Sequence, residues 1–151
     1  MFREMRRRKQ ALSLESCVEV LRKGTSGVLA VSGDDGYPYA VPLSYVYDDG
    51  RLFFHCAPSG HKLDAIAGNE KASFCVIDQD HVVPEEYTTY YRSVIAFGRA
   101  RVLEDEGEKR AALEKLAERY SPRQEEGRRA EIDKLFQRVC MVELAVEHMS
   151  G

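Results

Sequence analysis

The segment DGYPYAVPLSYVYDDGRLFFHCAPSGHK, residues 35–62, contains the strongest structural signals in this 151-residue chain. In residues 39–47 every second side chain is a large aliphatic or aromatic one, and this two-residue period is that of a β-strand. An Asp-Gly pair stands on each side of this strand and favours the positive φ angles of a tight hairpin turn. Residues 51–56 are therefore expected to return as the paired strand, and residues 59–67 to form a short helix.

His61 and Lys62 stand where that helix is expected to begin. Backbone N–H groups at a helix start carry partial positive charge and attract anions, and a lysine adds a full charge. Arg92 and Ser93, at the start of a later strand, are candidates for a second contact, because a phosphate dianion needs about two such partners to offset its desolvation. We expect a pocket for a phosphate-bearing cofactor at the edge of a small barrel; the alternative is an exposed helix start.

Pro42 interrupts an otherwise regular strand. Proline gives no N–H to a ladder, so a central paired position is disfavoured and an edge strand is expected. The functional interpretation is a flat ligand lying along this strand, with the backbone of Val41 and Leu43 and the hydroxyl of Ser44 facing it. His55, near the end of the next strand, is either a structural histidine or a functional one close to His61.

The rest of the chain supplies more strands and three more helices. Strands are expected over residues 27–32, 39–47, 51–56, 72–77, 90–103 and 140–146, and helices between positions 13 and 24, over 59–67, and around 113–120 and 132–139. Residues 78–89 are polar and aromatic and are expected to form a loop. The fold class expected is mainly β: one domain over residues 1–151, a closed or nearly closed antiparallel β-barrel of six strands with flanking α-helices.

Composition narrows the class of protein further. Hydrophobic residues make up 44% and the net charge is −3, as in a globular domain without general affinity for nucleic acid. The basic run at residues 6–9 is expected to be a solvated arm, with an RNA or phosphate contact as the alternative. No apolar stretch is long enough for a membrane span or a signal peptide, so we expect a cytoplasmic protein with no membrane partner.

Cysteines and histidines give no metal motif. The four cysteines lie in apolar segments without a CxxC pair and are expected to be reduced, buried thiols: Cys17, Cys56, Cys75 and Cys140. His81 and His148 are far from His55 and His61 in sequence, and no carboxylate–histidine spacing is present. No metal site is therefore expected.

Three stretches together resemble a known family: the run from residue 34 to 66, then FCVIDQD, then YRSVIAFGRARVLEDEGEKRAALEKL. They resemble the pyridoxamine 5′-phosphate oxidase-like flavin-binding split barrels, and within them the 5-nitroimidazole-resistance proteins. The resemblance covers nearly the whole chain. It implies a six-stranded split barrel that forms a homodimer, with FMN in a groove between the two subunits.

The resemblance also assigns roles to individual residues. The cofactor-binding residues that it implies are Val41, Pro42, Leu43, Ser44, Phe54, His55, His61, Lys62, Arg92 and Ser93. His61 and Lys62 would hold the phosphate, where the oxidases proper have an Arg-Lys pair. His55 is the candidate catalytic residue, as proton donor or substrate contact.

The activity that the resemblance implies is reduction of a small nitro compound, with electrons carried by the flavin. The chain departs from the oxidases proper, because Tyr39 replaces their arginine before the ring-lining strand and their pyridoxal-holding pattern is absent. Three alternatives stay open: a non-catalytic flavin- or haem-binding or sensing module, a deazaflavin enzyme, and a pyridoxamine-phosphate-oxidase-like enzyme. No GxGxxG follows a strand, so a nicotinamide would bind only transiently.

Overall fold

The two tight turns predicted from the Asp-Gly pairs are present. Asp35 and Gly36 have φ angles of 56° and 78°, and Asp49 and Gly50 have φ angles of 43° and 77°. These positive φ values match the right-handed twist of the strands that the turns connect. The turns join β1 to β2 and β3 to β4.

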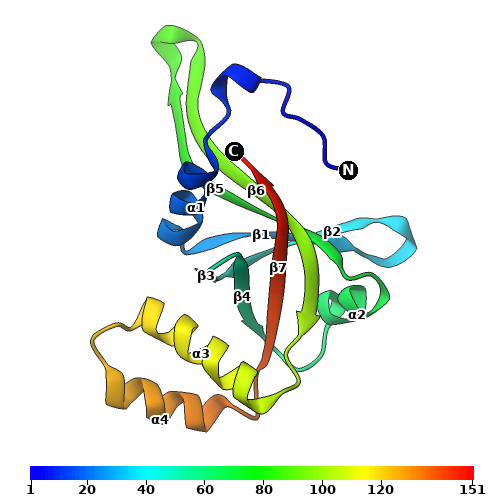
Figure 1. Cartoon of the computed structure of the whole chain (residues 1–151), viewed down its shortest axis with the longest axis vertical. Helices are drawn as coiled ribbons and strands as arrows, with labels where there is room; N and C mark the ends of the chain where they lie inside the picture. Colours follow the sequence, from blue (N-terminus) through cyan, green and yellow to red (C-terminus); the bar gives the residue numbers. More distant parts are fainter.

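The computed structural model describes residues 1–151. All strands belong to one antiparallel sheet in the order β2-β1-β5-β6-β7-β4-β3 (Figure 1). The strands are β1 (Ser26–Ser32), β2 (Pro38–Ser44), β3 (Val46–Asp48), β4 (Arg51–Cys56), β5 (Lys71–Val83), β6 (Thr88–Val102) and β7 (Cys140–Ser150). The mainly β prediction is confirmed.

The expected count of six strands differs from the seven found, because one predicted strand is divided at Tyr45. The backbone N–H of Tyr45 donates to the carbonyl of Thr25 and to the hydroxyl of Tyr120, each at 3.2 Å, instead of to a ladder partner. β2 pairs with β1, and β3 pairs with β4. β2 and β3 stand at the two ends of the sheet order but follow each other directly in the chain. The chain at Tyr45 therefore connects the two edges of the sheet and closes the barrel.

Four α-helices surround the sheet: α1 (Leu14–Lys23), α2 (His61–Gly68), α3 (Glu106–Tyr120) and α4 (Glu125–Leu135). The Ser13 side chain caps α1 as predicted, accepting from the N–H of Ser16 at 3.1 Å. α1 and α2 contribute side chains to the barrel core, whereas α3 and α4 form a second apolar cluster with the outer side chains Phe53 and Met141. In Figure 1 this helix pair lies at the end of the molecule opposite the β5–β6 hairpin.

The predicted loop over residues 78–89 is wrong. β5 continues to Val83 and β6 begins at Thr88, so the two strands form a long hairpin arm that projects from the barrel (Figure 1). Val82 is 62% exposed and Tyr87 is 96% exposed. Both faces of the arm meet solvent, and for that reason its sequence lacks the apolar–polar alternation of a half-buried strand.

Gly98 confirms the predicted irregularity in β6. The register between β6 and β7 shifts between Phe97 and Gly98. A Cβ atom at Gly98 would lie 2.0 Å from the carbonyl oxygen of Ala145. The close approach of β7 therefore requires glycine at this position.

Candidate functional site

β4 presents different residues to the two sides of the barrel wall. Leu52, Phe54 and Cys56 point into the barrel core. Phe53 and His55 point outward, Phe53 into the cluster made by α3 and α4, and His55 toward solvent. Phe54 is only 1% exposed, so a ligand on the outer face can meet its backbone but not its ring.

β2 also alternates between the two sides. Val41 and Leu43 are half-buried and pack against the barrel core. Pro42 and Ser44 are exposed on the outer side. β2 stands at one end of the sheet order, as the proline predicts, and of the four ring-lining candidates Pro42 and Ser44 offer their side chains to an outer ligand.

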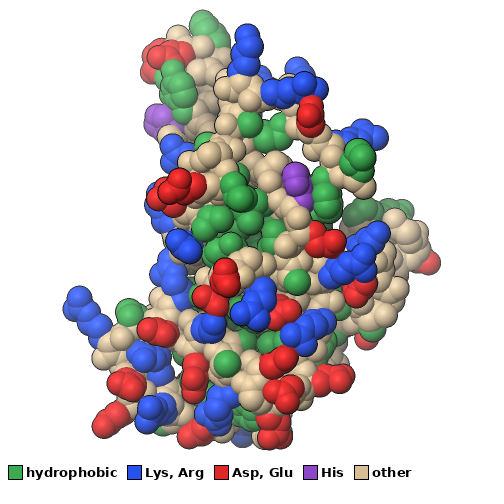
Figure 2. Space-filling view, in the orientation of Figure 1, with side chains coloured by type: hydrophobic (Ala, Val, Ile, Leu, Met, Phe, Trp, Pro, Cys, Tyr) green, Lys and Arg blue, Asp and Glu red, His purple; other side chains and the backbone are tan.

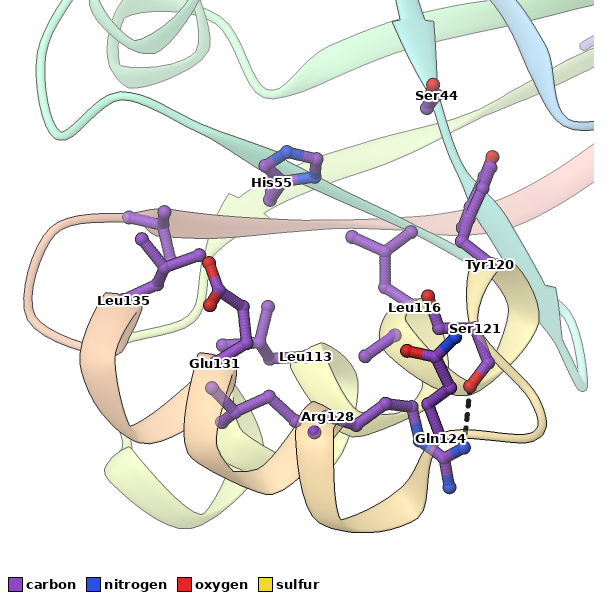
Figure 3. A pocket seen from close by; sticks show the side chains of 14 residues that line it. Ser44, His55, Leu113, Leu116, Tyr120, Ser121, Gln124, Arg128, Glu131 and Leu135 are labelled. Carbon is purple, nitrogen blue, oxygen red and sulfur yellow. Dashed lines mark hydrogen bonds between the residues drawn. The ribbon is translucent and has the colours of Figure 1, made fainter.

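A cavity of about 460 Å³ lies between these outer strand faces and the α3–α4 pair (Figure 3). Ser44 and His55 line it from the barrel side. The two helices and the turn between them supply its other walls, with the side chains Leu113, Leu116, Ala117, Tyr120, Ser121, Gln124, Arg128, Glu131, Ile132 and Leu135. The helices therefore pack against the barrel and form the opposite side of a cavity that the exposed His55 borders.

Tyr120, at the end of α3, fixes the relation between this helix and the strands. Its hydroxyl accepts from the N–H of Tyr45 and lies within hydrogen-bond distance of the carbonyls of Tyr45 and Thr25. Figure 3 shows its side chain directed toward Ser44. The sequence indicates Tyr120 only as the last apolar position of a helix that ends at Ser121-Pro122. Nothing in the sequence indicates its hydrogen bonds to the strands.

His61 and Lys62 begin α2, as predicted. Gly60 precedes them with φ 147° and ψ 175°, a conformation open to glycine alone, and no side chain caps the helix. The first N–H groups of α2 are therefore free for an outside acceptor. The His61 ring stacks on Tyr39 of β2 at a centroid distance of 4.1 Å, and its Nε2 lies 3.8 Å from the Asp34 carboxylate.

Lys62 is half-buried and its ammonium forms no ion pair. It is close enough to the end of β4 to lower the pKa of the Cys56 thiol, against the stronger raising effect of burial. Cys56 follows His55 directly. The start of α2 and the His55 end of β4 are thus neighbours in space as well as in sequence.

Arg92 and Ser93 are not brought to this place within one chain. They lie at the foot of the hairpin arm, and Figure 1 shows the arm and α2 on opposite sides of the barrel. Arg92 forms an ion pair with Asp78 at 3.0 Å. A ligand at His61 and His55 can therefore meet Arg92 only if a second copy of the chain supplies it.

An antiparallel barrel with a cavity between its outer strands and a helix pair defines the class: a small split-barrel protein. The pyridoxamine 5′-phosphate oxidase family model matches residues 13–151. The chain belongs to this family, and the resemblance noted in the sequence is confirmed.

Solved structures agree with this assignment. A candidate 5-nitroimidazole antibiotic resistance protein from Bacteroides thetaiotaomicron has a TM-score of 0.79 at 19% identity, over 93% of this chain and 86% of that one. A FAD-binding protein from Mesorhizobium loti has a TM-score of 0.68 at 25% identity, over 93% and 94% of the two chains. A FAD- and haem-binding protein from Mycobacterium smegmatis has a TM-score of 0.77 at 24% identity, over 93% and 71%.

No curated protein matches the chain. None of its helices has both the length and the apolar character needed to cross a bilayer.

Proposed function

We propose that this chain is an FMN-binding flavoprotein that reduces small nitro-aromatic compounds or related flat substrates. The observation that carries the proposal is the cavity beside His55 and Ser44, together with the uncapped start of α2, whose His61 stacks on Tyr39 of the same strand β2. The solved structures of similar fold include flavin-binding proteins and a candidate nitroimidazole-resistance protein. Their similarity supports the flavin-binding part of the proposal.

The residues present fit a flavin mononucleotide. Lys62 has an unpaired ammonium, and the first turn of α2 after Gly60 has free backbone N–H groups, which suits a phosphate. Tyr39, which contacts His61, and Ser44, which lines the cavity, stand five residues apart on β2, or roughly 17 Å. This span suits an extended flavin mononucleotide, with its phosphate at α2 and its ring along Pro42 and Ser44.

A second copy of the chain is the proposed cover for the ring. The outer faces of β1, β5 and β6 carry neighbouring apolar side chains, and Val28, Ile77 and Ile95 are 39%, 67% and 39% exposed. Figure 2 shows apolar side chains gathered over the middle of the molecule, where these strands cross in Figure 1. The row continues to Pro42 on β2, the register partner of Val28, so a copy docked here would also border the ligand.

Bound FMN would supply the electrons for nitro reduction. Reduction of a nitro group also consumes protons, and a ring nitrogen of His55 is the proposed donor to a nitro oxygen. Leu113 and Leu116 on α3 would hold a flat substrate and exclude water, and Ser44 would orient the ring edge. His55 would thus lie between the apolar wall of the cavity and the strands proposed to bind FMN.

The first experiment is to release the chromophore of the purified protein, identify it by mass, and follow the bound flavin under anaerobic conditions. Reduction by NADH or NADPH, followed by reoxidation on addition of a 5-nitroimidazole, is the expected result. A flavin that stays oxidised with both donors would exclude the reductase. FAD, haem or a deazaflavin as the chromophore would overturn the FMN assignment and keep the fold.

The role of His55 is tested separately with His55→Ala. We expect nitro-dependent reoxidation to slow by roughly a hundredfold, the usual size of a general-acid contribution, while flavin content is retained. His81→Ala is the matched control, because His81 lies on the exposed hairpin arm. Equal reoxidation rates in the two variants would remove His55 from the mechanism.

A further inference from the structure

Cys56 and Cys140 lie opposite each other where β4 and β7 pair. Cys56 is the last residue of β4, Cys140 is the first residue of β7, and the two are direct partners in the antiparallel register. Both are free thiols. Cys56 belongs to the barrel core, and Cys140 packs against the same core.

The strand geometry nearly meets the needs of a disulfide. Direct partners in an antiparallel pair have Cα atoms roughly 4.5 or 5.5 Å apart, inside the range of about 4.4–6.8 Å that disulfides occupy. Their Cβ atoms lie roughly 4.5–5.5 Å apart, so closure needs an approach of about 1 Å. Because both cysteines stand at strand ends, the backbone can make this approach without opening the rest of the ladder.

The other two cysteines have no such partner. Cys75 on β5 stands opposite Val28 on one side and Ile95 on the other. Cys17 lies on α1 and is buried in the barrel core. The pairing of Cys56 with Cys140 is therefore specific to this end of the barrel.

We propose that Cys56 and Cys140 are a reversible redox pair, which a small-molecule disulfide such as oxidised glutathione converts into a cross-strand disulfide. The half-exposed Cys140 thiolate attacks the glutathione disulfide and releases one glutathione thiolate. The Cys56 thiolate then displaces the second glutathione. Two cysteine thiols and one glutathione disulfide thereby give one protein disulfide and two glutathione thiols, which take up the two cysteine protons.

The order of attack follows from the surroundings of the two thiols. Burial raises the pKa of Cys56 to about 11, the Cys140 thiol adds to the rise, and the Lys62 ammonium opposes it. Cys56 is thus a poor first nucleophile at neutral pH. A disulfide that must draw two strands together is strained, and strained disulfides are the readily reduced ones.

The pair is well placed to affect the ligand site. Residues 57–60 run from Cys56 to the start of α2, and Val139, which lines the cavity, precedes Cys140. Closure of the disulfide would move both segments. Given the proposed FMN site, oxidation should weaken FMN binding by roughly tenfold, as expected for loss of one charge-assisted contact.

The test treats the folded protein with oxidised glutathione, quenches it with iodoacetamide and digests it with trypsin. We expect a disulfide-linked pair of peptides, residues 52–62 and 139–151, that dithiothreitol separates. Cys75 is the internal control and should carry only glutathione or alkylation. Free or separately glutathionylated Cys56 and Cys140 would overturn the proposal, as would a linked pair that forms only in denaturant.

Variants connect the disulfide to the ligand site. FMN affinity should fall on oxidation of the wild type and of Cys75→Ser, and should not change on oxidation of Cys56→Ser or Cys140→Ser. An equal fall in all four proteins would exclude regulation by this pair. If no form binds FMN, the proposed function fails, whereas the linked peptides still decide the redox pair.

Discussion

Lys62 on α2 and Arg92 on β6 are both predicted phosphate contacts, yet the fold gives them different surroundings. Arg92 is bound to Asp78 at 3.0 Å, and Lys23 lies 3.3 Å from the same carboxylate. Lys62 has no acidic partner and stands beside free backbone N–H groups. One cation is already neutralised, and the other is available.

A cationic residue is the stronger candidate for an anion site when its charge has no partner within the protein. The Asp78 side chain is 8% exposed, and a buried carboxylate needs its cations to offset desolvation. A phosphate at Arg92 would compete with that pair. Lys62 itself has no carboxylate partner, so a phosphate there would compete only with Asp34 for the neighbouring His61 ring, which lies 3.8 Å from that carboxylate, and four experiments test this contrast.

The largest effect is expected at Lys62. Lys62→Ala should weaken FMN binding by roughly tenfold to a hundredfold, because a charge-assisted contact to the phosphate is lost. Isothermal titration of the apoprotein with FMN measures the change. The matched control is Lys134→Ala, an exposed lysine on α4, and equal affinities in the two variants would refute the phosphate assignment.

The next effect is expected from the proposed second copy. Ile77→Lys places a charge on the exposed apolar face of β5 and should weaken the dimer by at least about tenfold, with FMN content falling in parallel. Sedimentation equilibrium and flavin absorbance measure the two quantities. Glu85→Lys, on the exposed turn of the arm, is the control. A monomeric variant that still carries its flavin would contradict the link.

A smaller effect is expected at Arg92. Arg92→Ala should reduce FMN affinity by about threefold, since the guanidinium would reach the ligand only across a dimer and shares its charge with Asp78. In the Ile77→Lys background the same substitution should have no effect on residual FMN binding. A loss as large as that of Lys62→Ala would reverse the ranking of the two cations.

The smallest effect tests how far the charge of Lys62 reaches. Burial raises the pKa of Cys56 to about 11, so alkylation of this thiol should increase with pH well beyond the ordinary cysteine range. The Lys62 ammonium favours the thiolate, so Lys62→Ala should raise this pKa further and slow alkylation at a fixed pH about twofold to threefold. Iodoacetamide labelling of Cys56, scaled to Cys75, measures it. Faster alkylation in the variant would place the ammonium away from this thiol.

Local signals predicted much of this fold. The Ser13 cap and the Asp-Gly turns act within a few residues, and the structure contains each of them. Residues 78–89 give no strand signal in the sequence, because an arm exposed on both faces has no buried side to produce a period. The break at Tyr45 escaped prediction because it depends on Tyr120, which comes from a distant helix.

The candidate site was predictable only in part. His61 and Lys62 begin a helix as predicted, because a helix start follows from local pattern, whereas the outward position of His55 was not predicted. The α3–α4 walls of the cavity and the pairing of Cys56 with Cys140 come from the order of strands in the barrel. The order of the strands in the sheet cannot be read from the spacing of residues in the sequence.

The hairpin arm has a thermodynamic consequence. Toward the tip, beyond the buried pair Val76 and Val94, its two strands pair only with each other, and a lone two-stranded hairpin is only marginally stable in water. If a second copy packs against its base, part of the free energy of association is used to order the arm. Protein concentration then becomes a folding variable, and dilution alone would melt this part of the chain while the barrel stays intact.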